Sequence, residues 1–432
     1  MNYEEARVYL EQASKYGSVL GLESMKGLLD KLDNPQDQLR FIHIAGTNGK
    51  GSVLAYLSTI LQKAGYRIGR YISPTLFSYR ERIQVNGQRI EKDALARHIT
   101  VIARAVEEIK RRQEPIPTVF EIETALAFLY FKEKKCDIAV VETGLGGALD
   151  ATNVIKTTLL EVIAPIGLDH MDVLGKTLGE IAAQKAGIIK EGTRVVTAAQ
   201  EPEAREVLER VCREKNCRLR QVEPQKLKDI HYGWDQQSFS YKQWENVQIS
   251  LAGKFQIQNA ALALEAAEQL REEGFDLPDT AVYEGMRETC WRGRFTVVSR
   301  EPVVILDGAH NPQAARALKN SLEQYFSGKK LYYVFGVFRD KDYKKIIELT
   351  APAAEHIITV ETPDNPRALP AEELREEVKR LNPAVESADS VESAVEKSLK
   401  LMNPEDVLVI FGSLSFLSLA DKAIKKGEKL HG

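Results

Sequence analysis

Residues 41–52, FIHIAGTNGKGS, place a lysine and a serine at the end of a glycine-rich loop that follows an apolar run. Glycines allow backbone N–H groups to close around phosphate oxygens, and the N-terminus of a following helix adds positive potential. Lys50 supplies a cation, and the hydroxyl of Ser52 can hold Mg²⁺. The alternative is an ordinary glycine-rich turn, which needs neither side chain. The segment therefore predicts a site for nucleotide phosphates.

This loop departs from the common phosphate-loop pattern G-x-x-x-x-G-K-[ST]. Position 44 is Ile where that pattern has Gly, and Gly51 separates Lys50 from Ser52. The variant G-T-N-G-K-G-S is narrower than the general motif, so it indicates a smaller group of nucleotide-binding proteins.

Two polar residues, Glu142 and His170, end later strand-like segments. Ligands of open parallel sheets bind beyond the carboxyl ends of the strands, so Glu142 is expected in the same crevice as the phosphate loop. A carboxylate suits Mg²⁺, which prefers oxygen ligands, and an imidazole beside Asp169 is a less usual metal ligand. From the residues alone, Glu142 could instead cap a loop and His170 could lie in a surface turn.

Lys185 falls on the apolar side of a predicted helix at residues 178–189. That side also carries Leu178, Ile181, Ala182 and Ile188. Desolvation would lower the pKa of a lysine that faces the core, which could then be nucleophilic or be modified so that its charge is removed. The alternative is a lysine whose stem lies along the apolar surface while its ammonium reaches water.

A second group of polar residues lies in the C-terminal part of the chain. The segment DGAHNP (307–312) combines an acid, a flexible glycine, a histidine and a helix-starting proline after an apolar run. Arg294 is a candidate phosphate ligand because a guanidinium offers a planar fork of donors. Ser413 follows the strand-like run 407–411 and is expected to face the cleft. Asp307 could instead cap a helix, and Arg294 could be an ordinary surface charge.

Strand-like and helix-like segments alternate through most of the chain, which predicts an α/β protein with parallel sheets and helices on both faces. Residues 1–293 are expected to form a phosphate-loop NTPase-like domain around a mostly parallel sheet. This domain should contain a hairpin at Asn86-Gly87 and a small antiparallel insert at 232–251. The alternation restarts after CWRGRF (290–295), so residues 294–432 are expected to form a smaller, Rossmann-like α/β domain.

The composition excludes several classes of protein. A hydrophobic content of 44% and a charged content of 28% are typical of a globular protein, and a net charge of −3 gives no reason to expect nucleic acid or an anionic membrane as a partner. No run of about 18 apolar residues indicates a membrane span. Cysteines without paired spacing predict reduced thiols and no zinc site. We therefore expect a cytoplasmic protein without nucleic-acid or membrane partners. For the oligomeric state we expect a monomer.

A series of segments, taken in order, resembles the folylpolyglutamate synthase/dihydrofolate synthase family of the Mur ligase superfamily. The resemblance runs from about Tyr16 to Ser413, and the shared order of the segments makes it specific. The segments are AGTNGKGS (45–52), SPTLFSYRERIQVNG (73–87), TVFEIETALAF (118–128), VETGLGGALDATN (141–153), GLDHMDVLG (167–175), AAQKAGIIK (182–190), QNAALAL (258–264), GRF (293–295), DGAHNP (307–312) and FGSLS (411–415).

The resemblance implies a ligase that uses ATP and Mg²⁺. Residues that match the family's ATP contacts are Gly49, Lys50, Gly51, Ser52, Asn259, Arg294 and Asp307, and those that match its magnesium site are Ser52, Ser73, Glu142 and His170. Lys185 matches a lysine that family members carry as a carbamate, whose negative charge would help to position metal or nucleotide. The catalytic residues implied are Lys50, Lys185, His170 and His310.

The same resemblance implies a pocket for the pteroate part of a folate. Residues Gly144–Ala148 and Gly21–Met25 would contribute to it, and 73–87 matches a mobile loop near it. The implied substrate contacts are Thr118, Val119, Phe120, Glu121 and Ser413.

Three positions depart from the family pattern. Ala148 and Ser24 stand where arginine is common, and Arg292 stands where proline is usual. Ala148 and Ser24 fall near the implied folate site, so the choice of pterin substrate follows less directly from the sequence than the use of ATP.

The implied reaction joins L-glutamate to the γ-carboxylate of a folate through an acyl phosphate, and the sequence leaves open whether dihydropteroate is also an acceptor. A Mur-type ligase for UDP-muramyl peptides is an alternative, against which the pteroate-pocket motifs speak. A kinase or hydrolase would not need the DGAHNP turn. A nucleotide-gated binding protein without catalysis would not need the set Lys50, Glu142, His170 and Lys185.

Overall fold

The computed structural model describes residues 1–14 and 21–431, so Tyr16, where the family resemblance begins, lies outside the described residues. The chain divides into two compact units, which are described separately below. The first unit contains Met1–Gly167, Met171–Pro224 and Asn259–Glu288. The second contains Leu168–His170, Gln225–Gln258 and Thr289–Gly432.

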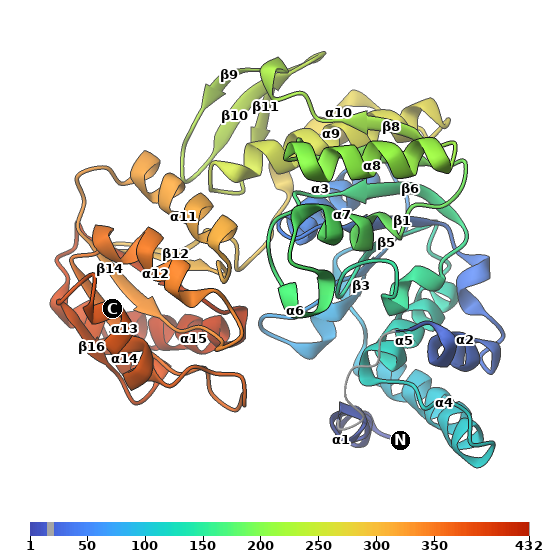
Figure 1. Cartoon of the computed structure of the whole chain (residues 1–432), viewed down its shortest axis with the longest axis horizontal. Coiled ribbons are helices and arrows are strands. Elements are labelled where there is room, and N and C mark those ends of the chain that lie inside the picture. Colours follow the sequence, from blue (N-terminus) through green and yellow to red (C-terminus); the bar gives the residue numbers. More distant parts are fainter. Residues whose placement is uncertain (15–20, 432) are drawn as a thin grey trace. The chain divides into compact units, whose positions relative to one another are not determined.

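An eight-stranded sheet in the order β4-β3-β2-β5-β1-β6-β7-β8 forms the centre of the first unit (Figure 1). The pairs β2–β3 and β3–β4 are antiparallel and the other pairs are parallel, which confirms the predicted mostly parallel sheet. The strands are β1 (Phe41–Ala45), β2 (Ile68–Tyr71), β3 (Ile83–Val85), β4 (Gln88–Arg89), β5 (Ile138–Glu142), β6 (Thr158–Ile163), β7 (Arg194–Thr197) and β8 (Arg218–Gln221).

Helices cover both faces of this sheet, as the fully buried strands β1 and β5 require. On the face that carries Phe41, one apolar cluster joins the strands to α1, α2, α4 and α5, and a second cluster around Ala45 joins them to α7 and α8. Helix α3 packs on the other face, where Thr59 accepts a hydrogen bond from Arg70 of β2, and α10 packs against α3. The helices are α1 (Tyr3–Ala13), α2 (Glu23–Asp30), α3 (Lys50–Lys63), α4 (Lys92–Arg111), α5 (Val119–Glu133), α6 (Met171–Leu174), α7 (Leu178–Ala186), α8 (Pro202–Glu214) and α10 (Asp279–Glu288). Helix α9 (Phe255–Glu272) begins in the second unit and belongs to the first from Asn259 onward.

The predicted hairpin at Asn86-Gly87 is confirmed. These two residues join β3 to β4 and have φ values of +47° and +74°. Two central residues in the left-handed region define the turn that matches the twist of a hairpin, and asparagine and glycine are the residues that adopt it most readily. The Asn86 side chain also accepts a hydrogen bond from the backbone N–H of Ile68, at 2.8 Å, which ties the turn to β2.

The second unit contains a six-stranded sheet in the order β12-β13-β17-β14-β15-β16, in which β12–β13 is the antiparallel pair. Helices flank this sheet, and the expected C-terminal α/β fold is confirmed. Its elements are β12 (Thr296–Arg300), β13 (Val303–Asp307), α11 (Pro312–Tyr325), β14 (Leu331–Phe335), α12 (Tyr343–Thr350), β15 (His356–Thr359), α13 (Ala371–Lys379), β16 (Val385–Ser387), α14 (Val391–Leu401), β17 (Val407–Phe411) and α15 (Leu414–His431).

The predicted antiparallel insert is also present, as the three strands β9 (Leu227–His231), β10 (Gln237–Tyr241) and β11 (Trp244–Ile249). This small sheet groups with the second unit. The predicted domain boundary after residue 293 stays a prediction. Among the described residues, no helix combines the length and the apolar character that crossing a bilayer requires.

Candidate functional site

The glycine-rich loop joins β1 to the start of α3. Gly49 precedes the helix with φ of +83°, and among the described residues no side chain caps the helix start. The first backbone N–H groups of a helix have no partner within the helix, so this end suits an anion. A Cβ atom on Gly49 would lie 2.5 Å from Oδ1 of Asn259, so a glycine is needed for space as well as for conformation. The structure thus brings together Gly49 and Asn259, two of the predicted nucleotide contacts.

Glu142 lies beside Lys50 at the carboxyl edge of the sheet. It pairs in register with Ile44 on β1, and its Oε1 lies 3.7 Å from Nζ of Lys50. The residue is only 6% exposed, which makes its charge interactions stronger than those of a surface residue. The expectation that Glu142 and the glycine-rich loop share one edge of the sheet agrees with this geometry.

Lys185 lies in the interior, with 4% of its surface exposed, although it is part of the short helix α7. Its Nζ donates to the main-chain carbonyl of Gly46 at 2.9 Å. Lys50 donates to the same carbonyl at 3.1 Å. The lysine therefore faces the core, as the apolar stripe predicts, and its ammonium group does not reach the surface.

Contacts with the segment after β6 hold the glycine-rich loop in place. The backbone N–H groups of Thr47 and Asn48 both donate to the carbonyl oxygen of Pro165, at 2.9 and 3.2 Å. The side chain of Gln200 contacts this segment at two points. Its Nε2 donates to the backbone carbonyl of Ala164, and its Oε1 accepts from the backbone N–H of Ile166. Sequence reasoning missed Gln200, since nothing distinguishes it from an exposed glutamine in a loop.

The segments predicted to line a pteroate pocket meet in the first unit. Glu121 accepts from the backbone N–H of Thr118 at 2.6 Å, and Thr118 accepts from that of Glu121 at 3.3 Å. This reciprocal pair is a capping box at the start of α5 and explains both residues structurally. The second oxygen of Glu121 accepts from Ser24 at 2.5 Å. Gly144 lies so close to Phe120 that a Cβ atom would be 2.5 Å from the ring.

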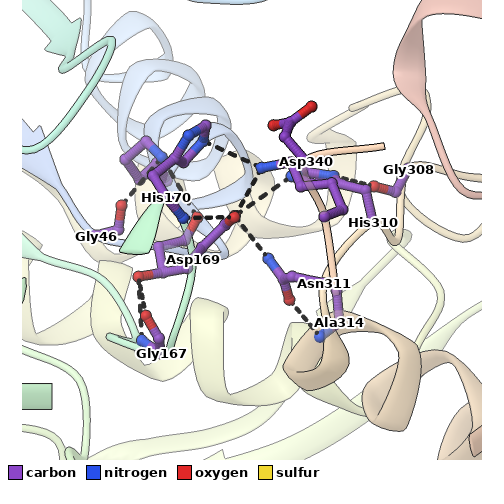
Figure 2. A network of polar contacts seen from close by, with 12 residues as sticks. Gly46, Gly167, Asp169, His170, Gly308, His310, Asn311, Ala314 and Asp340 are labelled. Atoms are coloured by element: carbon purple, nitrogen blue, oxygen red, sulfur yellow. Dashed lines mark hydrogen bonds and ion pairs between the residues drawn. The ribbon is translucent and has the colours of Figure 1, made fainter. Parts of the chain in front are cut away.

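In the second unit, Asp169 forms the centre of a polar network (Figure 2). Its Oδ1 lies 2.7 Å from Nζ of Lys341, and both side chains are buried. Its Oδ2 accepts from the amide of Asn311 at 3.0 Å and lies 3.5 Å from Nε2 of His310. Burial alone would raise the pKa of Asp169, but the hydrogen bond from His310 and the charges of His310 and Lys341 outweigh it and hold the pKa well below its usual range.

His170 has φ of +51° and its Nε2 lies 3.3 Å from Nζ of Lys341. Desolvation of the ring lowers the pKa of His170 to about 4, although the residue as a whole is exposed, so its imidazole is neutral at pH 7. The residue does not end a strand, because β6 stops at Ile163. Lys341 was missed by sequence reasoning, since it is one lysine within the charged segment RDKDY and its spacing carries no signal.

The predicted magnesium ligands fall in both units. Ser52, Ser73 and Glu142 belong to the first unit and His170 to the second, so this set stays a prediction. Within the described residues, no group of three or more His, Cys, Asp or Glu side chains could hold a metal ion. A magnesium site made of one carboxylate, hydroxyl groups, phosphates and water does not need such a group.

Asp307 ends β13 and accepts from the backbone N–H groups of Phe295 and Ala309, at 2.6 and 2.8 Å. Burial raises the pKa of this carboxyl group. Arg294 donates to the carbonyl of Gly308 at 3.4 Å, and Nδ1 of His310 lies 2.7 Å from the same oxygen. The GRF and DGAHNP segments therefore meet within the second unit. Ser413 follows β17, is buried, and accepts from the backbone N–H of Ser415.

Comparison with known proteins gives two family matches. The Mur ligase middle domain matches residues 44–267, and the Mur ligase, glutamate ligase domain matches residues 293–414. The chain is 38% identical to the dihydrofolate synthase/folylpolyglutamate synthase of Bacillus subtilis (strain 168), across 98% of this chain and 99% of that protein.

Solved structures are similar over the same extent. The folylpolyglutamate synthase of Mycobacterium tuberculosis complexed with ADP has a TM-score of 0.89 and 29% identity, and the match covers 98% of this chain and 99% of that one. Escherichia coli FolC in complex with DHPP and ADP has a TM-score of 0.86 and 30% identity, with 98% of each chain covered. Both units take part in these similarities.

Proposed function

Because this chain belongs to the Mur ligases, in the folylpolyglutamate synthase/dihydrofolate synthase family, we propose that it is an ATP-dependent ligase that adds L-glutamate to the γ-carboxylate of a folate. Relatives that match almost the whole chain are named as folylpolyglutamate or dihydrofolate synthases, which favours this function over a ligase for UDP-muramyl peptides. Structures of relatives with ADP support the use of ATP.

The observation that carries the proposal is the arrangement around Gly46. The glycine-rich loop leads into a helix start without a side-chain cap, Lys50 lies beside it, and the buried Glu142 lies 3.7 Å from that lysine. A cation, the backbone N–H groups of a helix start and a carboxylate at one sheet edge can bind a nucleotide phosphate together with its metal ion.

The reaction has two steps. A carboxylate oxygen of the folate attacks the γ-phosphorus of ATP, the bond to the bridging oxygen breaks, and ADP leaves an acyl phosphate behind. The amine nitrogen of L-glutamate then attacks the acyl carbon, loses a proton, and displaces phosphate to form the amide. Both steps build negative charge, so the main contribution to catalysis is expected from positioned cations and backbone donors.

Within this scheme, Gly49, Gly51 and Lys50 would bind the phosphates of ATP, and Asn259, Arg294 and Asp307 would contribute further nucleotide contacts. Oxygen ligands suit Mg²⁺, and the buried carboxylate of Glu142 beside the loop fits that preference. The residues proposed to hold the ion are Ser52, Ser73, Glu142 and His170. Bound Mg²⁺ would neutralise negative charge on the phosphates.

Lys185 is proposed to carry a carbamate. Two lysines that donate to one carbonyl oxygen repel each other if both are cationic, and a carbamate would replace this repulsion by attraction to Lys50. In the second unit, His310 is proposed to be catalytic and Ser413 to contact substrate. Thr118, Val119, Phe120 and Glu121 are proposed to line the pteroate pocket.

The direct test is product analysis. Purified protein with ATP, Mg²⁺ and L-glutamate should add one glutamate residue, measured by mass spectrometry, to tetrahydrofolate. The same assay with dihydropteroate decides whether the enzyme is bifunctional. No glutamate addition to either acceptor would refute the proposed function.

A further inference from the structure

His43 is a buried histidine that the proposed mechanism does not use. It lies on β1, three residues before Gly46, and none of its surface is exposed. Its neighbours on the same face of the strand, Phe41 and Ala45, belong to two apolar clusters. Burial is the main reason that the pKa of His43 is lowered to about 3, so the ring is neutral at physiological pH.

The Nε2 atom of His43 lies 2.8 Å from Oγ1 of Thr152. The same hydroxyl lies 2.5 Å from Oδ1 of Asp150, which also accepts from the backbone N–H of Thr152 at 3.0 Å. Burial raises the pKa of Asp150, whereas hydrogen bonds from Thr152 and from the backbone N–H groups of Leu145 and Gly144 favour its ionised form. As a carboxylate it only accepts hydrogen bonds, so the single proton of the Thr152 hydroxyl is donated to Asp150. The hydroxyl oxygen must then accept a hydrogen bond from Nε2–H of His43. This fixes the tautomer of the ring and the donor-to-acceptor direction of the hydrogen bonds from His43 to Asp150.

This chain of hydrogen bonds reaches both ends of the loop between β5 and residue 152. The other oxygen of Asp150, Oδ2, accepts from the backbone N–H of Leu145 at 2.8 Å. Next to Leu145, Gly144 packs against the ring of Phe120, which is one of the proposed pocket residues. The hydrogen-bond chain therefore connects the strand that leads into the phosphate loop with the loop that forms one side of the proposed pocket.

We propose that His43 is a positioning residue that holds the 144–152 loop in the geometry needed to bind the pteroate part of the acceptor. The inference rests on the proposed function, because that function assigns the pocket to this loop. An apolar side chain would suit the packing beside Phe41 and Ala45 better, since Nδ1 of His43 has no hydrogen-bond partner among the described residues. Packing alone therefore does not explain a histidine at this position, whereas the hydrogen bond from its Nε2–H to Thr152 does.

The test compares variants that remove or keep the donor. His43→Leu removes the bond to Thr152, and Thr152→Val removes the hydroxyl that bonds both His43 and Asp150. His43→Gln, in contrast, places an amide N–H near the position of Nε2. We expect the first two to raise the KM for the pterin acceptor about tenfold, the size of effect that one hydrogen bond supports, and to leave the KM for ATP and L-glutamate within about twofold. His43→Gln should stay close to the wild type.

The double variant His43→Leu/Thr152→Val should be no worse than the more impaired single variant, because both changes break the same chain. Ile42→Val, on the opposite face of β1, is the control for a loss of packing and should leave all three KM values unchanged. An unchanged acceptor KM in both single variants, a parallel rise in the KM for ATP, or a His43→Gln enzyme as impaired as His43→Leu would overturn the inference.

Hydrogen–deuterium exchange separates this inference from the proposed function. Faster exchange in peptides covering 144–153 of His43→Leu, with unchanged exchange in 46–51, is expected whether or not a folate is the substrate. Unchanged exchange in 144–153 would contradict the positioning role. If the exchange changes but the wild-type enzyme does not use pterin acceptors, the proposed function fails and the loop's link to a pteroate pocket fails with it.

Discussion

Lys50 and Lys185 donate to the same atom, the carbonyl oxygen of Gly46, at 3.1 and 2.9 Å. Lys50 comes from the start of α3 and Lys185 from α7, so two different helices direct ammonium groups at the glycine-rich loop of the proposed phosphate site. Both lysines are largely removed from solvent, where like charges repel more strongly than in water. A change of charge at either lysine of this pair should therefore have a large effect on catalytic activity.

The proposed carbamate on Lys185 gives the first prediction. Protein equilibrated with ¹³C-bicarbonate should show a carbamate carbon signal that is absent from Lys185→Ala, and removal of CO₂ should lower activity reversibly. We expect Lys185→Ala to lose activity on the order of 100-fold, as for loss of an electrostatic catalytic group. Lys176→Ala, at an exposed position nearby, should behave as the wild type. Full activity without CO₂, together with no signal, would contradict the carbamate.

The phosphate site gives the second prediction. Lys50→Ala and Glu142→Ala should each reduce turnover by about 10²–10³-fold or more, because each removes charge at the site of phosphoryl transfer. Each variant should remain folded under assay conditions, which a measurement of its melting temperature checks. Lys63→Ala, at the other end of α3, where the lysine pairs with Glu288, is the control and should keep its activity. Normal glutamate-dependent ADP release by either site variant would refute the assignment.

The buried pair of Asp169 and Lys341 gives a prediction about stability. Lys341→Met should destabilise the protein by about 3 kcal/mol, because a buried carboxylate loses its closest positive charge. Urea denaturation measures this difference, and Lys345→Met, at an exposed position of α12, should have little effect. Adding Asp169→Asn to Lys341→Met should recover part of the loss. A double variant less stable than Lys341→Met would contradict the pairing argument.

Glu161 predicts a pH dependence of stability. It is fully buried on β6, and burial raises its pKa from 4.5 to about 7. Between these values the folded protein holds a proton that the unfolded chain has lost, so this group makes stability fall as pH rises from about 4.5 to about 7. Glu161→Gln should therefore be more stable than the wild type by on the order of 2–3 kcal/mol at about pH 8, and the difference should vanish near pH 4.

Denaturation at both pH values measures the effect of Glu161→Gln, with Glu191→Gln at an exposed position as the control. An equal difference at the two pH values would show that burial of the Glu161 charge is not its cause.

Local patterns account for the parts of this molecule that the sequence predicts. The glycine-rich loop before α3, the left-handed turn at Asn86-Gly87 and the inward direction of Lys185 all follow from residue types at fixed spacing. The partners of buried polar side chains do not follow from such local patterns. Lys341 contacts Asp169 across 172 positions of sequence, and His43 contacts Thr152 across 109. Periodicity indicates which side chains are buried, whereas the choice of partner depends on how distant strands come together.

The proposed reaction of this chain joins L-glutamate to a folate with hydrolysis of ATP to ADP and phosphate. The most direct measurement is ADP release with tetrahydrofolate, dihydropteroate or a UDP-muramyl peptide as acceptor, each with and without L-glutamate. The proposed function predicts sustained ADP release only with a pterin acceptor and L-glutamate together. Release that depends on the muramyl peptide, or release that is independent of L-glutamate, would contradict it.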